Sequence, residues 1–162
     1  MTGMDRVRKH RRAAGLVASL VLVAGIGAWF LLLLSDDGDL SMGYFGPDKQ
    51  HQWAQQLVAG LNTHDAEQVP LLRISGKQLT VQKVAIEAVM PAPGCDYELA
   101  SVEDRGEQGL NDVPGLTGQN PTYRFDMTVK EFCAGQPTQT RDIGVVAIAE
   151  MGYWEPYHFV AD

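Results

Sequence analysis

Residues 123–133, YRFDMTVKEFC, have the clearest periodicity in the chain. Large apolar side chains alternate with polar or charged ones: Tyr123, Phe125, Met127 and Val129 on one face, and Arg124, Asp126, Thr128 and Lys130 on the other. A period of two residues is typical of a β-strand with one face in the core and one toward water. The segment therefore predicts a half-buried sheet, with Asp126 in water rather than in a pocket.

Further strands are predicted on both sides of this one. Residues 78–90 are rich in β-branched residues and end at Pro91, and residues 95–104, 138–151 and 153–160 follow as apolar runs bounded by turn residues. Residues 106–121 contain four Gly and two Pro and are predicted as a long loop, where function could lie. The strands together predict an antiparallel meander.

Ahead of the strands, the periodicity is that of a helix. Residues 48–62, DKQHQWAQQLVAGLN, place one apolar stripe along a helix: Trp53, Ala54, Leu57, Val58 and Leu61. A second, short helical turn is predicted for residues 66–72. Helices first and antiparallel strands afterwards predict an α+β domain in which a curved, cone-like sheet wraps one long helix and one short helix.

Residues 13–34, AAGLVASLVLVAGIGAWFLLLL, carry no charge and predict a transmembrane helix, because 22 residues in a helix cover roughly 33 Å. Five basic residues precede this segment and three aspartates follow it, which predicts a cytoplasmic tail at residues 1–12. A cleaved signal peptide is the alternative, but the apolar run is too long and lacks an A-x-A-like site. Residues 35–47 are then a linker, and residues 48–162 an extracytoplasmic domain.

The chain after residue 34 is acidic, with 8 lysines and arginines against 19 aspartates and glutamates, a net charge of −11. This charge argues against nucleic acid as a partner. Cys95 and Cys133 both lie in this part of the chain, and we expect them to form a structural disulfide. A redox-active pair would normally show C-x-x-C spacing.

The helix end WAQQLVAGLNTHDAEQV, the strands after it and the closing aromatic G-Y-W strand resemble the nuclear transport factor 2-like superfamily, which includes SnoaL-like and ketosteroid-isomerase-like proteins. With its basic tail and single span, the chain also resembles the membrane-anchored versions in actinobacterial cell envelopes. The resemblance covers about residues 47–160. It implies a cone between sheet and helix, where catalytic members place acids, His or Tyr.

The polar candidates for such a cone form no spaced motif: His51, His64, Asp65, Tyr97, Tyr123, Asp126 and His158. His64 and Asp65 are predicted as a turn at the helix end. The four histidines lack H-x-x-x-H or H-x-H spacing, and no nucleotide or hydrolase motif is present, so we assign no catalytic residue, metal or cofactor. We expect a ligand cavity, if open, to be lined by Trp53, Tyr97, Phe125, Trp154 and His158.

Three functions compete at this point. The first is a non-catalytic module that binds another membrane or envelope protein as an accessory subunit, which agrees with single-span anchoring and an acidic surface. The second is carriage of a lipid or other apolar molecule, which needs an open cone. The third is an isomerase- or dehydratase-like enzyme, which needs a buried acid or His beside a Tyr. The bilayer, through residues 13–34, and a second copy of the chain, as a homodimer, are further expected partners.

Overall fold

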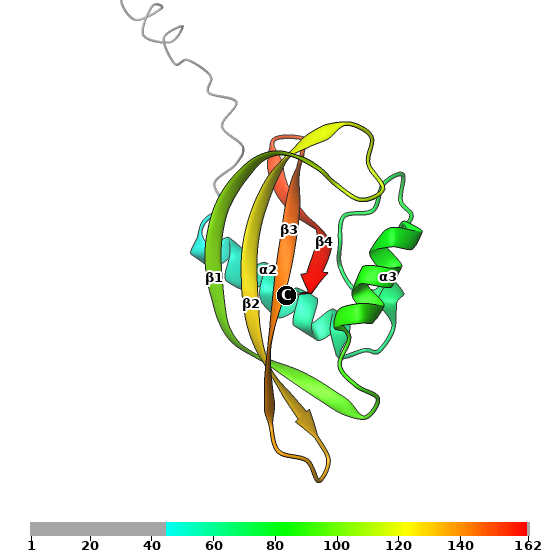
Figure 1. Ribbon diagram of the computed structural model, residues 1–162, viewed down its shortest axis with the longest axis vertical. Helices are drawn as coiled ribbons and strands as arrows, with labels where there is room; N and C mark the ends of the chain where they lie inside the picture. Colours follow the sequence, from blue (N-terminus) through cyan, green and yellow to red (C-terminus); the bar gives the residue numbers. More distant parts are fainter. Residues whose placement is uncertain (1–44, 162) are drawn as a thin grey trace, which may run out of the picture. The chain divides into compact units, whose positions relative to one another are not determined.

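Four antiparallel strands, hydrogen-bonded in chain order, make up the sheet on which two helices pack (Figure 1). The computed structural model describes residues 45–161. The elements are α2 (Pro47–Leu61), a 3-10 turn η1 (Ala66–Gln68), α3 (Thr80–Val89), β1 (Cys95–Asp112), β2 (Gln119–Cys133), β3 (Gln139–Glu150) and β4 (Tyr153–Ala161). The predicted transmembrane helix at residues 13–34 lies outside the described residues. None of the helices within residues 45–161 is long and apolar enough to cross a membrane.

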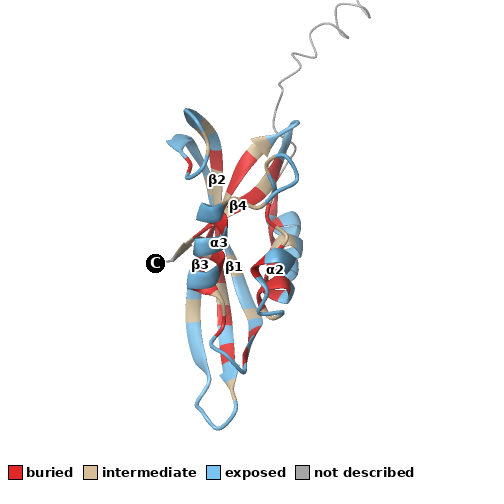
Figure 2. Ribbon diagram, turned by 90° about the vertical axis from the view of Figure 1, so that its right-hand side faces the viewer, coloured by how far each residue is buried: buried red, intermediate tan, exposed pale blue. Residues whose placement is uncertain are grey.

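Helix α2 covers one face of the sheet, here called the inner face. The predicted stripe is confirmed, since Ala54, Leu57, Val58 and Leu61 are buried. Pro47 occupies the first turn, where its missing N–H leaves no bond unmade. Figure 2 shows the buried residues concentrated on the strands and on the side of α2 toward them. The main core therefore lies between α2 and the sheet.

The strand that the alternation predicted is confirmed as the inner strand β2. Phe125, Met127 and Val129 are fully buried on the inner face. Phe125 pairs with Val145 and Met127 with Ile143 across β3. The chain joins this core at its first described residue, because the ring of Phe45 is buried against Phe125 at 5.8 Å between centroids. Phe45, which the sequence placed in the linker, therefore belongs to the fold.

The strand predicted for residues 78–90 is wrong, because this segment forms helix α3. Its β-branched residues suggested a strand, but Val81 and Val84 are 38% and 59% exposed. The buried positions are Gln82, Ile86 and Val89, which have the spacing of a helix face. The helix ends just before Pro91, as expected for a residue that precedes proline. The short helix predicted for 66–72 is only the η1 turn, so α3 is the second helix of the domain.

Most of the loop predicted for residues 106–121 is also strand. β1 continues to Asp112 and β2 begins at Gln119, so only residues 113–118 connect them. Two glycines of this segment lie at β-bulges of β1. The register with β2 shifts between Asp104 and Gly106 and again between Glu107 and Gly109, and both glycines have positive φ. Such bulges bend and twist a strand, which agrees with the strong curvature of β1 in Figure 1.

A second, smaller core lies where the 113–118 connection meets β4 and the start of α3. Tyr157, Val113 and Ile148 are buried together there, with Leu79 packed against them. The register between β3 and β4 shifts at Val146/Ala147, and Tyr157 is the extra residue on β4. Its hydroxyl donates a hydrogen bond to the carbonyl of Pro114 at 3.0 Å. The bulge therefore fixes the connection over the sheet.

Candidate functional site

The candidate site lies on the outer face of the sheet, the face opposite α2. Arg124 and Val146 belong to this face because they alternate with the buried Phe125 and Val145. Two hollows of about 300 and 380 Å³ occur here and share Gln108 and Arg124. We call the combined depression the outer-face groove. It is lined by Arg105, Gln108, Asn111, Asp112, Val113, Pro114, Thr122, Arg124, Asp126, Val146, His158 and Val160.

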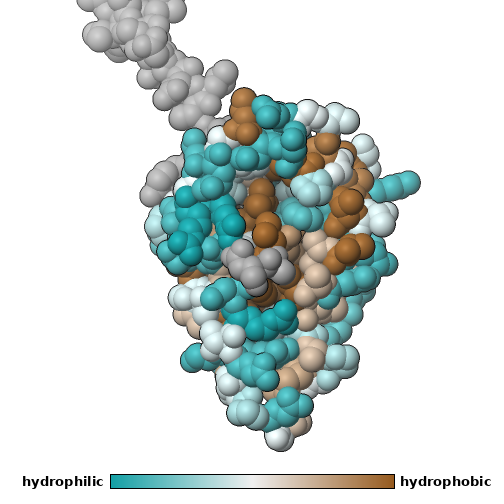
Figure 3. Space-filling model, in the orientation of Figure 1, coloured by the Kyte–Doolittle hydropathy of each residue, from teal (hydrophilic) through white to brown (hydrophobic). Residues whose placement is uncertain are grey.

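The outer-face groove combines an apolar floor with polar walls. Val146 and Val160, on neighbouring strands, provide apolar surface, while Asn111 and Thr122 lie at the β1–β2 side. The Asn111 amide donates a hydrogen bond to Thr122 Oγ1 at 2.8 Å. Figure 3, in which the strands lie in front of α2, shows hydrophobic side chains in the middle of this view and along its upper right side, with hydrophilic ones to the left and below. A groove of this kind suits a ligand or peptide with both apolar and hydrogen-bonding groups.

Asp126 holds the polar end of the groove together. Arg124 Nε donates to its Oδ1 at 2.8 Å, and Arg105 Nε donates to its Oδ2 at 2.6 Å. Gly144 pairs with Asp126 on β3, and a Cβ at Gly144 would lie 3.0 Å from Arg124 Nη2. Because Gly144 has no Cβ, the Arg124 guanidinium has room to lie over the neighbouring strand β3. Glu103 joins the cluster through Arg105 Nη1 at 2.7 Å.

The prediction that Asp126 lies in water is wrong, although its face of the strand is the predicted one. The residue is only 8% exposed, because the two guanidiniums cover it. Burial acts to raise the pKa of Asp126, but the hydrogen bonds from Arg124 and Arg105 outweigh it, so the pKa falls below its ordinary value. A carboxylate that is ionised and doubly hydrogen-bonded serves as a structural anion, not as a proton carrier near neutral pH.

His158 lies in the groove and not in the cone. It pairs with Val146 across β3 and β4, on the outer face. Burial lowers the pKa of its imidazole below the ordinary value, so the ring is neutral at neutral pH. Its Nδ1 atom is buried, and no group of residues 45–161 hydrogen-bonds to it. This nitrogen is therefore enclosed by the fold and is not open to a partner in the groove.

A second cavity, of about 320 Å³, lies at the start of α2. It is lined by Pro47, Asp48, Gln50, His51, Val102 and Asp104. Beside it the Tyr123 hydroxyl donates to Asp104 Oδ1 at 2.8 Å, and the buried Gln50 amide donates to the Phe45 carbonyl at 2.6 Å. Burial, together with the hydrogen bond and charge of Asp104, raises the pKa of Tyr123 to about 12. Burial also acts to raise the pKa of Asp104, but its hydrogen bonds from Tyr123 and Gly106 lower it overall.

The two partners of this Tyr123–Asp104 pair are therefore poor acid–base catalysts at neutral pH, because the tyrosine retains its proton and the carboxylate remains ionised. The pair does resemble the Tyr and acid arrangement that the enzyme hypothesis requires. Its geometry instead fastens the beginning of α2 to the sheet, since Gln50 also reaches Tyr123 Oη at 3.3 Å.

Of the five residues predicted to line a ligand cavity, four lie on the inner side of the sheet. Tyr97, Phe125 and Trp154 are buried in the main core, and Trp53 packs against it. The Tyr97 hydroxyl donates to the Val89 carbonyl at 3.1 Å, and burial raises its pKa. Among these five residues, only His158, on the outer face, lines the outer-face groove or the cavity at the start of α2. The structure therefore separates His158 from the four aromatic residues.

The remaining histidine and acid candidates take local roles. His64 has a positive φ in the turn after α2, and its Nε2 lies 3.0 Å from the carbonyl oxygen of Cys95. Asp65 accepts a hydrogen bond from the Glu67 N–H at 3.0 Å and begins η1. The predicted turn is confirmed. His51 is exposed on α2 and lies 3.1 Å from the Gln55 amide.

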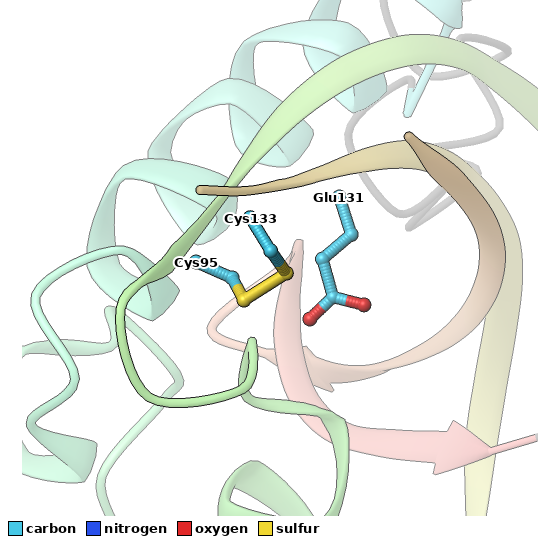
Figure 4. Close-up of side chains that lie close together, drawn as sticks. All are labelled: Cys95, Glu131 and Cys133. Atoms are coloured by element: carbon cyan, nitrogen blue, oxygen red, sulfur yellow. A yellow bond between two sulfur atoms is a disulfide. The ribbon is translucent and has the colours of Figure 1, made fainter. Parts of the chain in front are cut away.

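Cys95, Cys133 and Glu131 are close enough to share a metal ion (Figure 4), but the two cysteines form the predicted disulfide. A disulfide sulfur offers no thiolate to a metal. Cys95 pairs directly with Cys133 at the end of the β1–β2 ladder. The buried Glu131 accepts a hydrogen bond from the Ala92 N–H at 2.9 Å, which ties the α3–β1 turn to β2. This cluster is a structural fastening.

Sequence reasoning missed several residues of the groove and of the second cavity: Arg105, Gln108, Asn111, Thr122, Asp104 and Gln50. The first three and Asp104 fall in or near the segment predicted as loop. The face of the sheet on which their side chains lie could therefore not be predicted. The dense spacing of glycines at residues 106 and 109 was the one signal of bulges that could have indicated a bent strand.

The fold and its cavities define an α+β domain with two helices on a four-strand antiparallel sheet. The chain matches no protein-family model, no curated protein and no solved structure.

Proposed function

We propose that this protein is a membrane-anchored, extracytoplasmic module that binds another membrane or envelope protein through its outer-face groove, without catalysing a reaction. The Cys95–Cys133 disulfide supports an oxidising, extracytoplasmic location. The anchor is proposed from residues 13–34 of the sequence. The arrangement of a curved sheet on a long helix and a shorter one also supports the resemblance to nuclear transport factor 2-like proteins.

One observation carries the non-catalytic part of the proposal. Asp126, Asp104 and Tyr123, which lie beside the described cavities, have pKa values that are shifted away from neutral pH, and they are committed to hydrogen bonds within the fold. Asp126 is paired with two arginines, and Asp104 with Tyr123. Their pKa values are lowered for both acids and raised for the tyrosine. General acid–base catalysis favours groups that titrate near the working pH.

The shape and chemistry of the groove support a protein partner. The depression extends from the Arg105–Asp126 pair on β1 and β2 to Val160 on β4, so it crosses the whole width of the sheet. An extended peptide segment fills such a depression better than a compact small molecule does. Carriage of an apolar molecule in the cone is less well supported, because Phe125 and Trp154 are packed into the core there.

Site-specific photocrosslinking in the native membrane tests this proposal. A photoreactive residue replaces Gln108 in the groove or, as the matched control, Lys130, which is exposed on the same strand system but outside the groove. We expect a discrete protein adduct from position 108 and none from position 130. The adduct should be lost when Val160→Glu places a charge in the groove, and should persist with Val84→Glu on the exposed side of α3.

Four results would count against the proposal. Equal adducts from both positions would show that the groove is not selective, and an adduct with lipid alone would favour the carrier hypothesis. An adduct of twice the chain's own mass would replace the foreign partner by a second copy of the chain. Turnover of a small molecule that is abolished by His158→Ala, in a variant that remains folded, would establish an enzyme.

A further inference from the structure

Two large apolar side chains project from the tip of the β3–β4 hairpin. Met151 is 91% exposed and Tyr153 is 65% exposed. They flank Gly152, and both turn residues have positive φ, 49° at Met151 and 84° at Gly152. Two-residue hairpin turns of this kind favour Asn, Asp or Gly at the first position. The turn therefore presents a methionine where the local backbone would favour a small polar residue.

This tip lies near the point where the chain enters the domain. Trp154, the residue after Tyr153, is buried, and its ring centroid lies 5.4 Å from that of Tyr123. The Tyr123 ring is in turn 5.2 Å from the ring of Phe45, the first described residue. The base of the hairpin and the start of the domain therefore contact the same tyrosine.

The sequence limits how far this point can lie from a bilayer. Residues 35–44 separate the predicted transmembrane helix from Phe45. Ten residues span at most roughly 36 Å even when fully extended. A tether this short keeps the membrane surface at high local concentration, so that a contact too weak to hold a free protein can persist. Tyrosine is among the residues that prefer the interface between lipid and water.

We propose that the β3–β4 hairpin tip, Met151 to Tyr153, contacts the outer surface of the bilayer that anchors the chain. This inference rests on the anchor of the proposed function but not on the groove or its partner. The contact orients the domain, because it fixes a second point on the membrane besides the tether. Glu150 and Glu155 flank the tip, so the contact favours zwitterionic over anionic lipid.

Methyl NMR on the full-length chain in phosphatidylcholine nanodiscs tests the contact. The methionine methyl groups are labelled with carbon-13, and the Met151 signal is assigned with Met151→Leu. A lipid with a spin label near its headgroup should remove the Met151 signal, while a water-soluble gadolinium chelate should leave it. The signal of Met127, which is fully buried, serves as the internal reference. Phe132→Met adds an exposed methionine at the opposite end of β2, which should respond to the chelate and not to the lipid.

The outcomes distinguish failure of the contact from failure of the anchor. If the chain enters the nanodiscs but Met151 is removed by the chelate and retained with the labelled lipid, the hairpin contact is overturned and the anchor stands. If the chain does not enter nanodiscs, the anchor is overturned, and the contact with it. Loss of both the Met151 and the Phe132→Met signals to the labelled lipid would also overturn a specific contact, because it would indicate non-selective collision with the surface.

Discussion

Asn62, the residue after helix α2, hydrogen-bonds both backbone groups of Tyr97 on β1. Its Nδ2 donates to the Tyr97 carbonyl at 2.9 Å, and its Oδ1 accepts from the Tyr97 N–H at 2.8 Å. Tyr97 lies on an edge strand, because β1 pairs only with β2. The asparagine thus takes the place of a neighbouring strand at this position and joins the helix to the sheet.

Asn62→Ala should therefore lower the free energy of unfolding by about 2 kcal/mol, because two backbone groups lose their partners. Asn62→Asp keeps the acceptor for the Tyr97 N–H but turns a carboxylate oxygen toward the Tyr97 carbonyl oxygen, which also only accepts, so this variant should be destabilised as well. Urea denaturation of the residue 45–162 domain in both variants measures the difference. Equal stability of Asn62→Ala and the parent would contradict this account of the edge.

Removing the disulfide should have a larger effect. The Cys95–Cys133 bond closes a loop with a sequence separation of 38 residues. Constraint of the unfolded chain by a loop of that size stabilises the fold by roughly 4 kcal/mol in the chain-entropy model. We expect the double variant Cys95→Ser, Cys133→Ser to unfold at a lower denaturant concentration. Reductant should destabilise the parent and leave this double variant unchanged, which is the control.

Asp126→Asn should destabilise the sheet, because two guanidiniums lose their common anion. Solvent at the groove screens the pairs, so the expected loss is about 1 to 2 kcal/mol at neutral pH. Asp142→Asn, on the same face with one hydrogen bond from Thr128, is the matched control and should cost less. The folded-state pKa of Asp126 is lowered, so its stabilisation is complete above the unfolded pKa of about 3.9 and is lost as the pH falls through the folded value. Parent and variant should therefore converge in acid.

Gly60→Ala should destabilise the domain although alanine is the better helix former. In an exposed helix this change gains about 1 kcal/mol. At Gly60 the new Cβ would lie 2.9 Å from Val69 Cα and 2.9 Å from Pro70 Cδ, so the turn after α2 must move. A net loss of about 1 to 3 kcal/mol is expected from such overpacking. Ala59→Gly, at the exposed neighbouring position, isolates the propensity effect. A more stable Gly60→Ala protein would refute the close contact.

His158→Leu should reduce the pH dependence of stability in mild acid. Because burial lowers the pKa of folded His158, the unfolded chain binds a proton more readily. The domain should therefore lose stability as the pH falls below about 6.5, down to the lowered folded pKa. Denaturation curves of parent and variant at several pH values between neutrality and pH 5 measure this difference. Identical slopes for the two proteins would rule out a buried neutral imidazole.

Much of the fold could be predicted from side-chain periodicity, and the failures have specific physical causes. In β2 the apolar residues face one layer of core, so the alternation around Phe125 is undisturbed. In α3 the β-branched Val81 and Val84 are exposed, and the burial that decides the structure falls on Gln82 and Ile86. Gln82 can be buried because its amide donates hydrogen bonds to the Leu72 and Tyr157 carbonyls. These partners are distant in the sequence, so the local sequence does not indicate them.

The candidate site was less accessible to sequence reasoning, because its residues meet only after the strands pair. Asp126 was placed on the correct face, but its burial depends on Arg105, which comes from an irregular part of β1. The room for Arg124 depends on Gly144, the residue opposite Asp126 on another strand. Neither relationship produces a motif along the chain.

The burial of Phe45 also determines how mechanical load enters the domain. Any pull along the chain from its amino-terminal side reaches this residue before it reaches helix α2. Its ring is seated against Tyr123 and Phe125, both on the inner strand β2. Part of the force is therefore transmitted to the middle of the sheet through the Phe45 ring. This contact protects the first turn of α2 from being unwound by the pull.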